Sequence, residues 1–339
     1  MPPHEPNLRQ GGGLGSRPLS LRLLGPPAAG RLAQGLPKSL LGFVWAIGAY
    51  RQYWLLGLAI VVAALDAVPI EIQRRIVNQA IKQGDISLIV ALAAGYCALT
   101  ALQGLFKMTM NVSRGWVSES AVLDLRGYIS RAGHAHGDAA GSGTEISMLL
   151  AESEAVGGFV GDAVAEPALQ LGTLLSVMAY LVYIQPLMAL VLLGVIVPQL
   201  VFVPLMQMAI NRRVQGRIVT LREISGSVIG EGTPEQIRSL QSGQFETVFG
   251  LNMGVYELKF SMNFLMNFMH QLSIATILGV GGWFVVLGRT DIGTLVAFIS
   301  GLATIRSPWG DLVNWFQSFS VTRAKYRLVE ASLSGRSYE

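Results

Sequence analysis

Six stretches of this chain hold roughly twenty mostly apolar residues each, and they constrain its fold more than any other feature. They lie at about residues 54–70, 86–108, 159–184, 187–210, 264–287 and 292–319. A helix needs a run of this length to cross the hydrocarbon core of a bilayer. Apolar residues make up 51% of the chain and charged residues only 14%, against about 25% charged residues in typical globular domains. We therefore expect an all-α membrane protein with six transmembrane helices, which excludes a soluble enzyme.

The segments around these runs divide the chain into three parts. Residues 1–37 are rich in Gly, Pro and Arg, with Glu5 as their only carboxylate, which predicts a disordered basic tail. No apolar run there precedes a cleavage site, so a secretory signal peptide is not expected, whereas a transit peptide or an over-long start remains an alternative. Residues 38–333 are the predicted membrane domain, which begins with an interfacial helix interrupted by Arg51. Residues 334–339 are a C-terminal tail.

Basic residues predict the orientation of the helices. Six spans place both termini on one side, and positive charge gathers on the cytoplasmic side of membrane proteins. The side of the termini carries most of the basic residues, namely Arg9, Arg17, Arg22, Arg31, Lys38, Arg212, Arg213, Arg217, Arg222, Arg323, Lys325 and Arg327. The exception is the first loop on the opposite side, which holds Arg74, Arg75 and Lys82. Glu71 and Asp85 dilute its charge. We expect both termini in the cytoplasm and the protein in a bacterial inner membrane.

Two polar connections between spans are much longer than the others. Residues 109–158 and 211–263 keep the apolar periodicity of helices over about 50 residues each. In the second, Thr233 can cap a helix, Pro234 suits its first position, and Gln236 completes a capping box. The pattern then continues to Leu287, and about 54 residues make a helix of roughly 80 Å, against about 30 Å for the bilayer core. We therefore expect spans two to five to extend into the cytoplasm as long helical rods.

Four motifs follow one another along the chain. The first inner segment reads LDLRGYISRAGHAHGDAAGSGTEISMLLAESEAV, with motif residues Leu125, Arg126, Gly143, Ile146, Ser147 and Glu152. The start of the fifth helix reads GEGTPEQIRSLQSGQFETVFGLNMGVYELKF, with motif residues Glu231, Ile237, Arg238, Phe249 and Lys259. The turn into the sixth helix reads LGRTDIGTLVAFISGL, with Gly288, Gly293 and residues 295–298. The end of that helix reads SPWGDLVNWFQSFSVTRAKYRLVEA, with Pro308, Ala324 and Arg327.

In these motifs and their order, residues 40–333 resemble the transmembrane domain of ABC exporters. The family usually has Asp where Glu152 stands and Lys where Arg238 stands. The resemblance implies a domain-swapped homodimer or heterodimer that works by alternating access. Its implied partners are a nucleotide-binding ATPase, a second transmembrane domain, membrane lipid and a small-molecule, lipid or peptide substrate, without nucleic acid. The implied contacts with the ATPase lie in two coupling turns, at Arg131, His134, His136, Asp138, Arg222 and Glu223.

The chain itself carries no nucleotide-binding motif. The pattern Gly-x-x-x-x-Gly-Lys-(Ser/Thr) does not occur, and without it no loop cradles the phosphates. The stretch LQSGQ, Leu240 to Gln244, differs by two letters from the LSGGQ signature loop of ABC ATPases. It stands on a predicted rod, far from any phosphate loop, so we interpret the likeness as chance. We expect no cofactor on this chain, with ATP and Mg²⁺ bound by a nucleotide-binding domain that is a separate subunit or a missing part.

Polar residues inside the spans are candidates for a substrate pathway, because a charge in lipid is costly. They are Arg306, Asp311, Asn314, Glu166, Asp66 and Lys107. Arg306 and Asp311 lie about 140° apart around a helix, so we expect partners on another helix. Structural pairing, or snorkelling of Lys107 and Asp66, is the alternative. Cys97 is expected to be a buried small hydrophobe, and no metal site is expected.

Three functions stay open from the sequence. The resemblance favours the transport subunit of an ABC exporter. An ATP-independent transporter or channel would have short cytoplasmic loops, which the two long inner segments contradict. A membrane scaffold or regulator that keeps the fold without the ATPase is the third.

Overall fold

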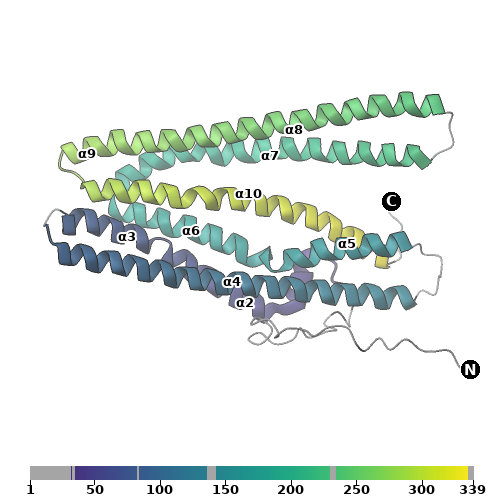
Figure 1. Ribbon diagram of the computed structural model, residues 1–339, viewed down its shortest axis with the longest axis horizontal. Coiled ribbons are helices and arrows are strands. Elements are labelled where there is room, and N and C mark those ends of the chain that lie inside the picture. Colours follow the sequence, from purple (N-terminus) through teal and green to yellow (C-terminus); the bar gives the residue numbers. More distant parts are fainter. Residues whose placement is uncertain (1–31, 33–34, 82–83, 136–142, 230–233, 335–339) are drawn as a thin grey trace, which may run out of the picture. The chain divides into compact units, whose positions relative to one another are not determined.

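The computed structural model describes residues 32, 35–81, 84–135, 143–229 and 234–334, and no strand occurs among them. The expectation of an all-α protein is therefore confirmed for these residues. Figure 1 shows the helices in chain order. They are α2 (Leu40–Leu65), α3 (Val68–Arg75), the π-helix η1 (Ile76–Ile81), α4 (Ile86–Ala135), α5 (Gly143–Val160), α6 (Asp162–Ile184), α7 (Pro186–Ile229), α8 (Pro234–Thr276), the π-helix η2 (Ile277–Gly281), α9 (Gly282–Val286) and α10 (Ile292–Ser334).

Five helical segments of the described chain are long and apolar enough to cross a membrane. They are Leu40–Gln79, Ile86–Arg131, Asp162–Ile184, Pro186–Leu221 and Gly243–Val286. The sixth predicted span forms as α10 but is not among the five, because Arg306, Ser307 and Pro308 interrupt its apolar run. The chain is therefore an integral membrane protein, and a sixth span is not confirmed.

Two predicted helix boundaries are confirmed. α6 ends at Ile184 and α7 begins at Pro186, so Gln185 alone makes the tight turn between the third and fourth predicted spans. α8 begins at Pro234, and the helix continues through η2 and α9 to Val286, one residue short of the predicted end. The π-turns of η2 inside this helix were not predicted, because a wider hydrogen-bond register leaves no mark on apolar periodicity.

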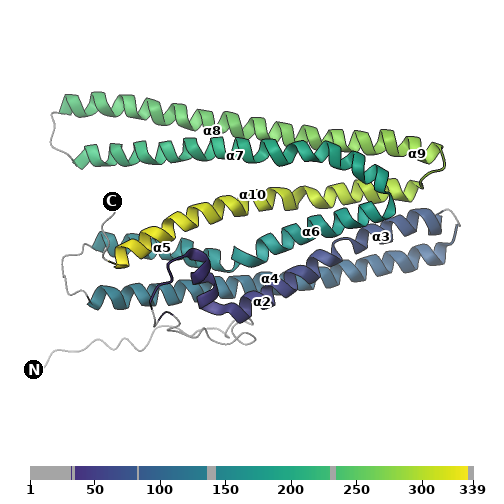
Figure 2. The same ribbon diagram turned by 180° about the vertical axis from the view of Figure 1, so that it is seen from behind.

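The first part of the chain differs from the prediction in where its break falls. α2 covers both the expected interfacial helix and the first span, and its two helical parts meet at Gly48, where the backbone leaves the helical region with φ 175° and ψ 69° (Figure 2). The predicted span begins later, at about residue 54. The expected outer loop is also partly helical. Arg74 and Arg75 lie on α3, where both donate to Glu71 at 2.7 and 2.6 Å, and pairs three and four residues apart favour a helix. Lys82 lies outside the described residues.

The described residues form two compact units, each with an apolar core of its own. Unit 1 takes in Met1–Leu65, Ala98–Thr173 and Asn314–Glu339, and unit 2 takes in Asp66–Cys97 and Leu174–Val313. In unit 1, Phe43 and Tyr326 are fully buried with ring centroids 5.3 Å apart. The Tyr326 hydroxyl donates to the carbonyl oxygen of Pro37, and burial raises the pKa of this phenol, which keeps it a neutral donor.

In unit 2, α7 and α8 run side by side as a hairpin (Figure 1). The Arg213 guanidinium donates to the carbonyl oxygen of Gly254, and a Cβ at Gly254 would meet Arg213 at 2.9 Å. One turn further, Arg217 Nη1 donates to Asn252 Oδ1 at 3.2 Å. The absence of a side chain at Gly254 thus leaves room for the Arg213 guanidinium against the α8 backbone.

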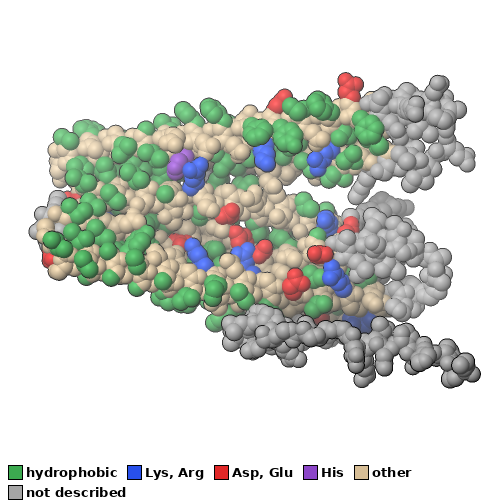
Figure 3. Space-filling view, in the orientation of Figure 1, with side chains coloured by type: hydrophobic (Ala, Val, Ile, Leu, Met, Phe, Trp, Pro, Cys, Tyr) green, Lys and Arg blue, Asp and Glu red, His purple; other side chains and the backbone are tan. Residues whose placement is uncertain are grey.

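Apolar side chains cover much of the helix surface (Figure 3). Along α8 the exposed residues include Phe249, Tyr256 and Phe264, which a water-soluble protein would bury. Only 6% of the apolar window of α4 is buried within the chain. Cys97 lies there and is exposed, so the prediction of a buried cysteine was wrong. The reason is that this stretch of α4 is apolar but packs little against the rest of the described chain.

Two glycines hold α5 against the backbone of α4 in unit 1. A Cβ at Gly157 would lie 2.6 Å from the backbone nitrogen of Val122. One turn later, a Cβ at Gly161 would lie 2.5 Å from Ser118 Oγ. Small residues four apart are a common means of bringing two membrane helices into contact. The neighbouring Gly158 has nothing within 4 Å of its Cβ position.

We expect Gly157→Ala to destabilise the protein by about 1–3 kcal/mol, because the added methyl group overpacks the contact with the Val122 backbone. Gly158→Ala is the matched control and should be neutral or stabilising by up to about 1 kcal/mol, since alanine favours a helix over glycine. Thermal unfolding of the purified variants in detergent measures both effects. Equal melting temperatures for the two variants would contradict the close α4–α5 contact.

Candidate functional site

The helix that contains α5 and α6 is broken at Gly161, the one residue between them. A helix end leaves backbone carbonyl and amide groups without partners inside the helix. In or near lipid such groups need partners from the protein, because no bulk water reaches them. We define the α5–α6 break as residues 158–162. Side chains of other helices must supply hydrogen-bond partners for its backbone groups.

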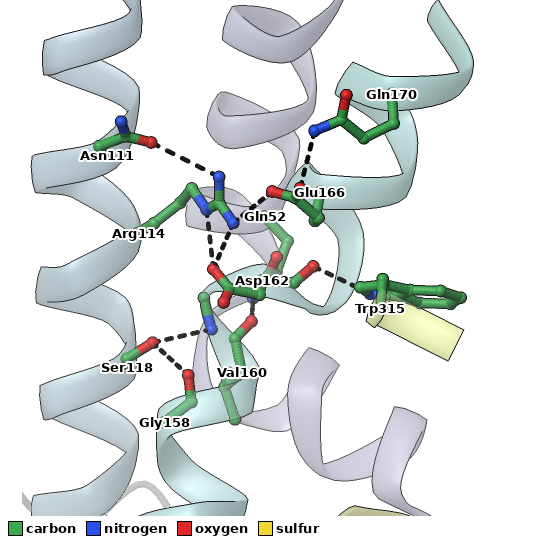
Figure 4. A network of polar contacts seen from close by, with 11 residues as sticks. Gln52, Asn111, Arg114, Ser118, Gly158, Val160, Asp162, Glu166, Gln170 and Trp315 are labelled. Carbon is green, nitrogen blue, oxygen red and sulfur yellow. Dashed lines mark hydrogen bonds and ion pairs between the residues drawn. The ribbon is translucent and has the colours of Figure 1, made fainter. Parts of the chain in front are cut away.

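Three helices of unit 1 supply those partners (Figure 4). From α4, the Ser118 hydroxyl donates to the carbonyl oxygen of Gly158 at 2.7 Å and accepts the N–H of Gly161 at 3.2 Å. From α2, Gln52 Nε2 donates to the carbonyl oxygen of Val160 at 2.9 Å. From α10, Trp315 Nε1 donates to the carbonyl oxygen of Asp162 at 3.2 Å. Hydrogen bonds thus join the break to α2, α4 and α10.

An ion cluster lies beside the break. We call Arg114, Asp162 and Glu166 the Arg114 cluster. Arg114 donates through Nε and Nη2 to Asp162 Oδ1, at 2.8 and 2.6 Å. Its Nη2 also approaches Glu166 Oε2 at 2.5 Å. Gln170 Nε2 donates to the other oxygen of Glu166 at 2.8 Å. Charge-assisted contacts of this length are stronger than neutral hydrogen bonds, so the cluster fixes α4 to the first turn of α6.

The cluster is largely withdrawn from solvent and its charges do not cancel. The side chains of Arg114 and Glu166 are 15% and 18% exposed, and that of Asp162 is 48% exposed. One guanidinium faces two carboxylates, so the formal charge of the cluster is negative. Desolvated charge is costly unless it is paired and hydrogen-bonded, which makes this arrangement a candidate for function.

Aromatic side chains surround the break in unit 1. The Phe159 ring lies 6.3 Å from Trp315 and 6.1 Å from Phe319, measured between centroids. The Arg51 guanidinium of α2 lies 3.4 Å from the centroid of the Trp116 ring, a cation–π geometry. Trp315 therefore both packs against Phe159 and donates a hydrogen bond to the break.

The sequence-predicted pathway residues do not gather in one place. Glu166 is in the Arg114 cluster, and Asp66 is a buried residue just after α2. Lys107 is half-buried on α4, and Asn314 is exposed on α10. In unit 2, Arg306 Nη2 donates to Asn267 Oδ1 of α8 at 2.8 Å, so the expected partner on another helix is confirmed.

Asp311 accepts instead from Ser307 one turn away on its own helix, at 2.9 Å. The coupling-turn residues are mostly beyond the described part of the chain. Arg131 is exposed near the end of α4. His136 and Asp138 lie outside the described residues, and so do the side chains of His134, Arg222 and Glu223.

The sequence reasoning missed Arg114, Asp162 and Gln52. Two carboxylates four residues apart, at 162 and 166, project from one face of a helix, and a glycine precedes the first. That pattern could have predicted a cationic partner, although not which residue supplies it. Within the described part of the chain, no group of three His, Cys, Asp or Glu side chains could hold a metal ion.

Compared with known proteins, the sequence matches no protein-family model and shows no significant match to a curated protein. The helices and the site are therefore the basis for the proposed function.

Arg114→Gln should destabilise the protein by about 2–4 kcal/mol, because it leaves two carboxylates without their cation in a site of low exposure. Adding Asp162→Asn and Glu166→Gln to it should restore stability to within about 1 kcal/mol of the original, since amides can hydrogen-bond in place of the ions. Arg126→Gln, which breaks a largely exposed pair with Glu154, should cost less than about 1 kcal/mol. Thermal unfolding distinguishes the three, and a triple variant no more stable than Arg114→Gln would refute the account.

Proposed function

We propose that this chain is the transmembrane subunit of an ATP-driven transporter of the ABC exporter type. It would move a small molecule, a lipid or a peptide across the membrane by alternating access. ATP would be bound and hydrolysed by a nucleotide-binding domain that is a separate subunit or a missing part. Two transmembrane domains would form the working dimer.

The observation that carries this proposal is the length of the helices. α4 has 50 residues and α7 has 44, which at about 1.5 Å per residue make roughly 75 and 66 Å. The helix from Pro234 to Val286 is of similar length. A bilayer core is only about 30 Å thick, so roughly half of each helix must stand outside it. Such rods give a membrane protein a rigid connection to a partner in water.

The pairing of the rods supports a mechanical role. Arg213 and Arg217 join α7 to α8 within the hairpin, so displacement at its far end would be transmitted along both helices. Along the sequence, the residues proposed to meet the ATPase fall within seven positions of the last residue of α4 or α7. They are Arg131, His134, His136, Asp138, Arg222 and Glu223. A secondary transporter has no use for extensions of this length.

Polar residues on α10 are the proposed part of the substrate pathway in unit 2. Arg306 is exposed although it pairs with Asn267, and Asp311 is half-exposed. A charged residue retained on an otherwise apolar helix suits a water-filled cavity better than lipid. Asn314, Asp66, Lys107 and Glu166 remain proposed pathway residues as well.

The proposed orientation, with both termini in the cytoplasm, can be tested with single cysteines. Cys97→Ser removes the one native cysteine. In that background Thr290→Cys lies in the turn between α9 and α10, and Arg131→Cys lies near the far end of α4. A membrane-impermeant maleimide should label Thr290→Cys in intact cells and Arg131→Cys only after permeabilisation. The reverse pattern would overturn the orientation.

The ATPase partner can be tested by purifying the full chain from its native membrane in a mild detergent. Mass spectrometry should find a co-purified polypeptide with a phosphate-binding loop, and the complex should hydrolyse ATP. Arg222→Ala combined with Glu223→Ala should lower this hydrolysis at least several-fold with the chain still in the membrane. Arg289→Ala, an exposed residue in the turn between α9 and α10, is the control and should leave hydrolysis unchanged.

Two outcomes would contradict the proposal. If no ATPase co-purifies and the chain alone moves solutes into ATP-free liposomes, the protein is an ATP-independent transporter. If neither hydrolysis nor transport accompanies the chain, it is a scaffold or regulator.

A further inference from the structure

The α5–α6 break leaves two oxygen atoms without a hydrogen-bond donor. Gln52 is 0% exposed, and its Oε1 has no hydrogen-bond partner although its Nε2 is bonded to Val160. Asp162 receives both Arg114 contacts on Oδ1, so its Oδ2 accepts no hydrogen bond from a described residue. A buried amide oxygen without a donor destabilises the folded state. This destabilisation is removed if something else occupies the site.

Both oxygens belong to side chains that lie at the α5–α6 break. The Gln52 amide nitrogen bonds to Val160, and Asp162 is only two residues further along the chain. Figure 4 shows the Gln52 side chain passing beside Asp162 to reach the Val160 carbonyl. An amide oxygen and a carboxylate oxygen therefore both border the same turn.

The charge of the surroundings favours a cation. Arg114 neutralises one of the two carboxylates, and among the described residues neither Asp162 nor Glu166 has another ion pair. The end of α5 adds to the negative charge near the site, because the last carbonyl groups of a helix carry partial negative charge. Interrupted membrane helices use their exposed carbonyl oxygens at C-terminal ends to coordinate small cations.

We propose that the α5–α6 break binds a monovalent cation, held by Asp162 Oδ2, Gln52 Oε1 and the last carbonyl oxygens of α5. Hard oxygen ligands suit an alkali cation or a primary ammonium group. A single open carboxylate beside a guanidinium is a weak site for a divalent ion, which usually takes more carboxylate ligands. Asp162 is 48% exposed at the first residue of its apolar helix, so the protein leaves one side of the site open.

This inference does not depend on the ATPase, because the site is made by residues of this chain alone. The test uses the purified full chain in detergent, without nucleotide, at constant ionic strength. Its melting temperature is measured in sodium chloride, methylammonium chloride and choline chloride. Binding to the folded state should raise the melting temperature saturably, by at least about 2 °C over choline. A rise with sodium identifies a metal ion, and a rise with methylammonium alone identifies an ammonium group.

Variants assign the effect to the site. Asp162→Asn should abolish the cation-dependent rise, whereas Glu119→Gln, an exposed carboxylate on α4, should keep it. Gln52→Leu should also abolish it, because it removes the amide oxygen. Because Gln52→Leu can also impair folding, Asp162→Asn is the deciding variant.

Equal melting temperatures in all three salts would overturn the proposal. A cation-dependent rise that persists in Asp162→Asn would overturn it as well, since the cation would then bind elsewhere.

Discussion

A backbone amide or carbonyl group inside a bilayer has no water to bond with, and the described fold follows from this constraint. Most of the chain meets it with continuous helices, in which each group bonds within its own helix. At Gly161 the helix is interrupted, and side chains of α2, α4 and α10 take over the task. The same residues bring Arg114 against Asp162 and Glu166. The hydrogen bonds between these helices and the proposed cation site thus both result from the interruption at Gly161.

Helix continuity also explains the proposed function. A helix that satisfies its own backbone can leave the membrane without losing its structure, so α4, α7 and α8 can extend into water as rigid rods. Gly254 leaves room for the Arg213 guanidinium between α7 and α8, and Gly157 lets α5 lie against the backbone of α4. Both glycines act through the space that a missing side chain leaves and not through flexibility. The proposed ATPase would push on these rods from outside the bilayer.

Much of this architecture could be predicted from the sequence, because hydropathy reports which segments prefer lipid. The turn at Gln185, the start of α8 at Pro234 and a partner for Arg306 on another helix were predicted. Prediction failed where a distant contact or a backbone detail decides the outcome. The Arg114 contacts join residues 48 and 52 positions apart, and no local pattern encodes such a pairing. The bend at Gly48 and the π-turns depend on backbone geometry that side-chain periodicity does not record. The burial of Cys97 was predicted wrongly because an apolar sequence does not show whether a residue packs inside the chain or lies on its outer surface.

In this description, continuous helices carry the chain out of the membrane. A nitroxide scan along α8, η2 and α9, from residue 243 to residue 286 in a Cys97→Ser background, measures where they leave it. Accessibility to oxygen should dominate over about twenty residues from Val286 inward, and accessibility to a water-soluble nickel complex should dominate beyond them. A helical period near 3.6 residues should persist through both zones. Lipid accessibility along the whole scan, or loss of the period outside the bilayer, would contradict the account.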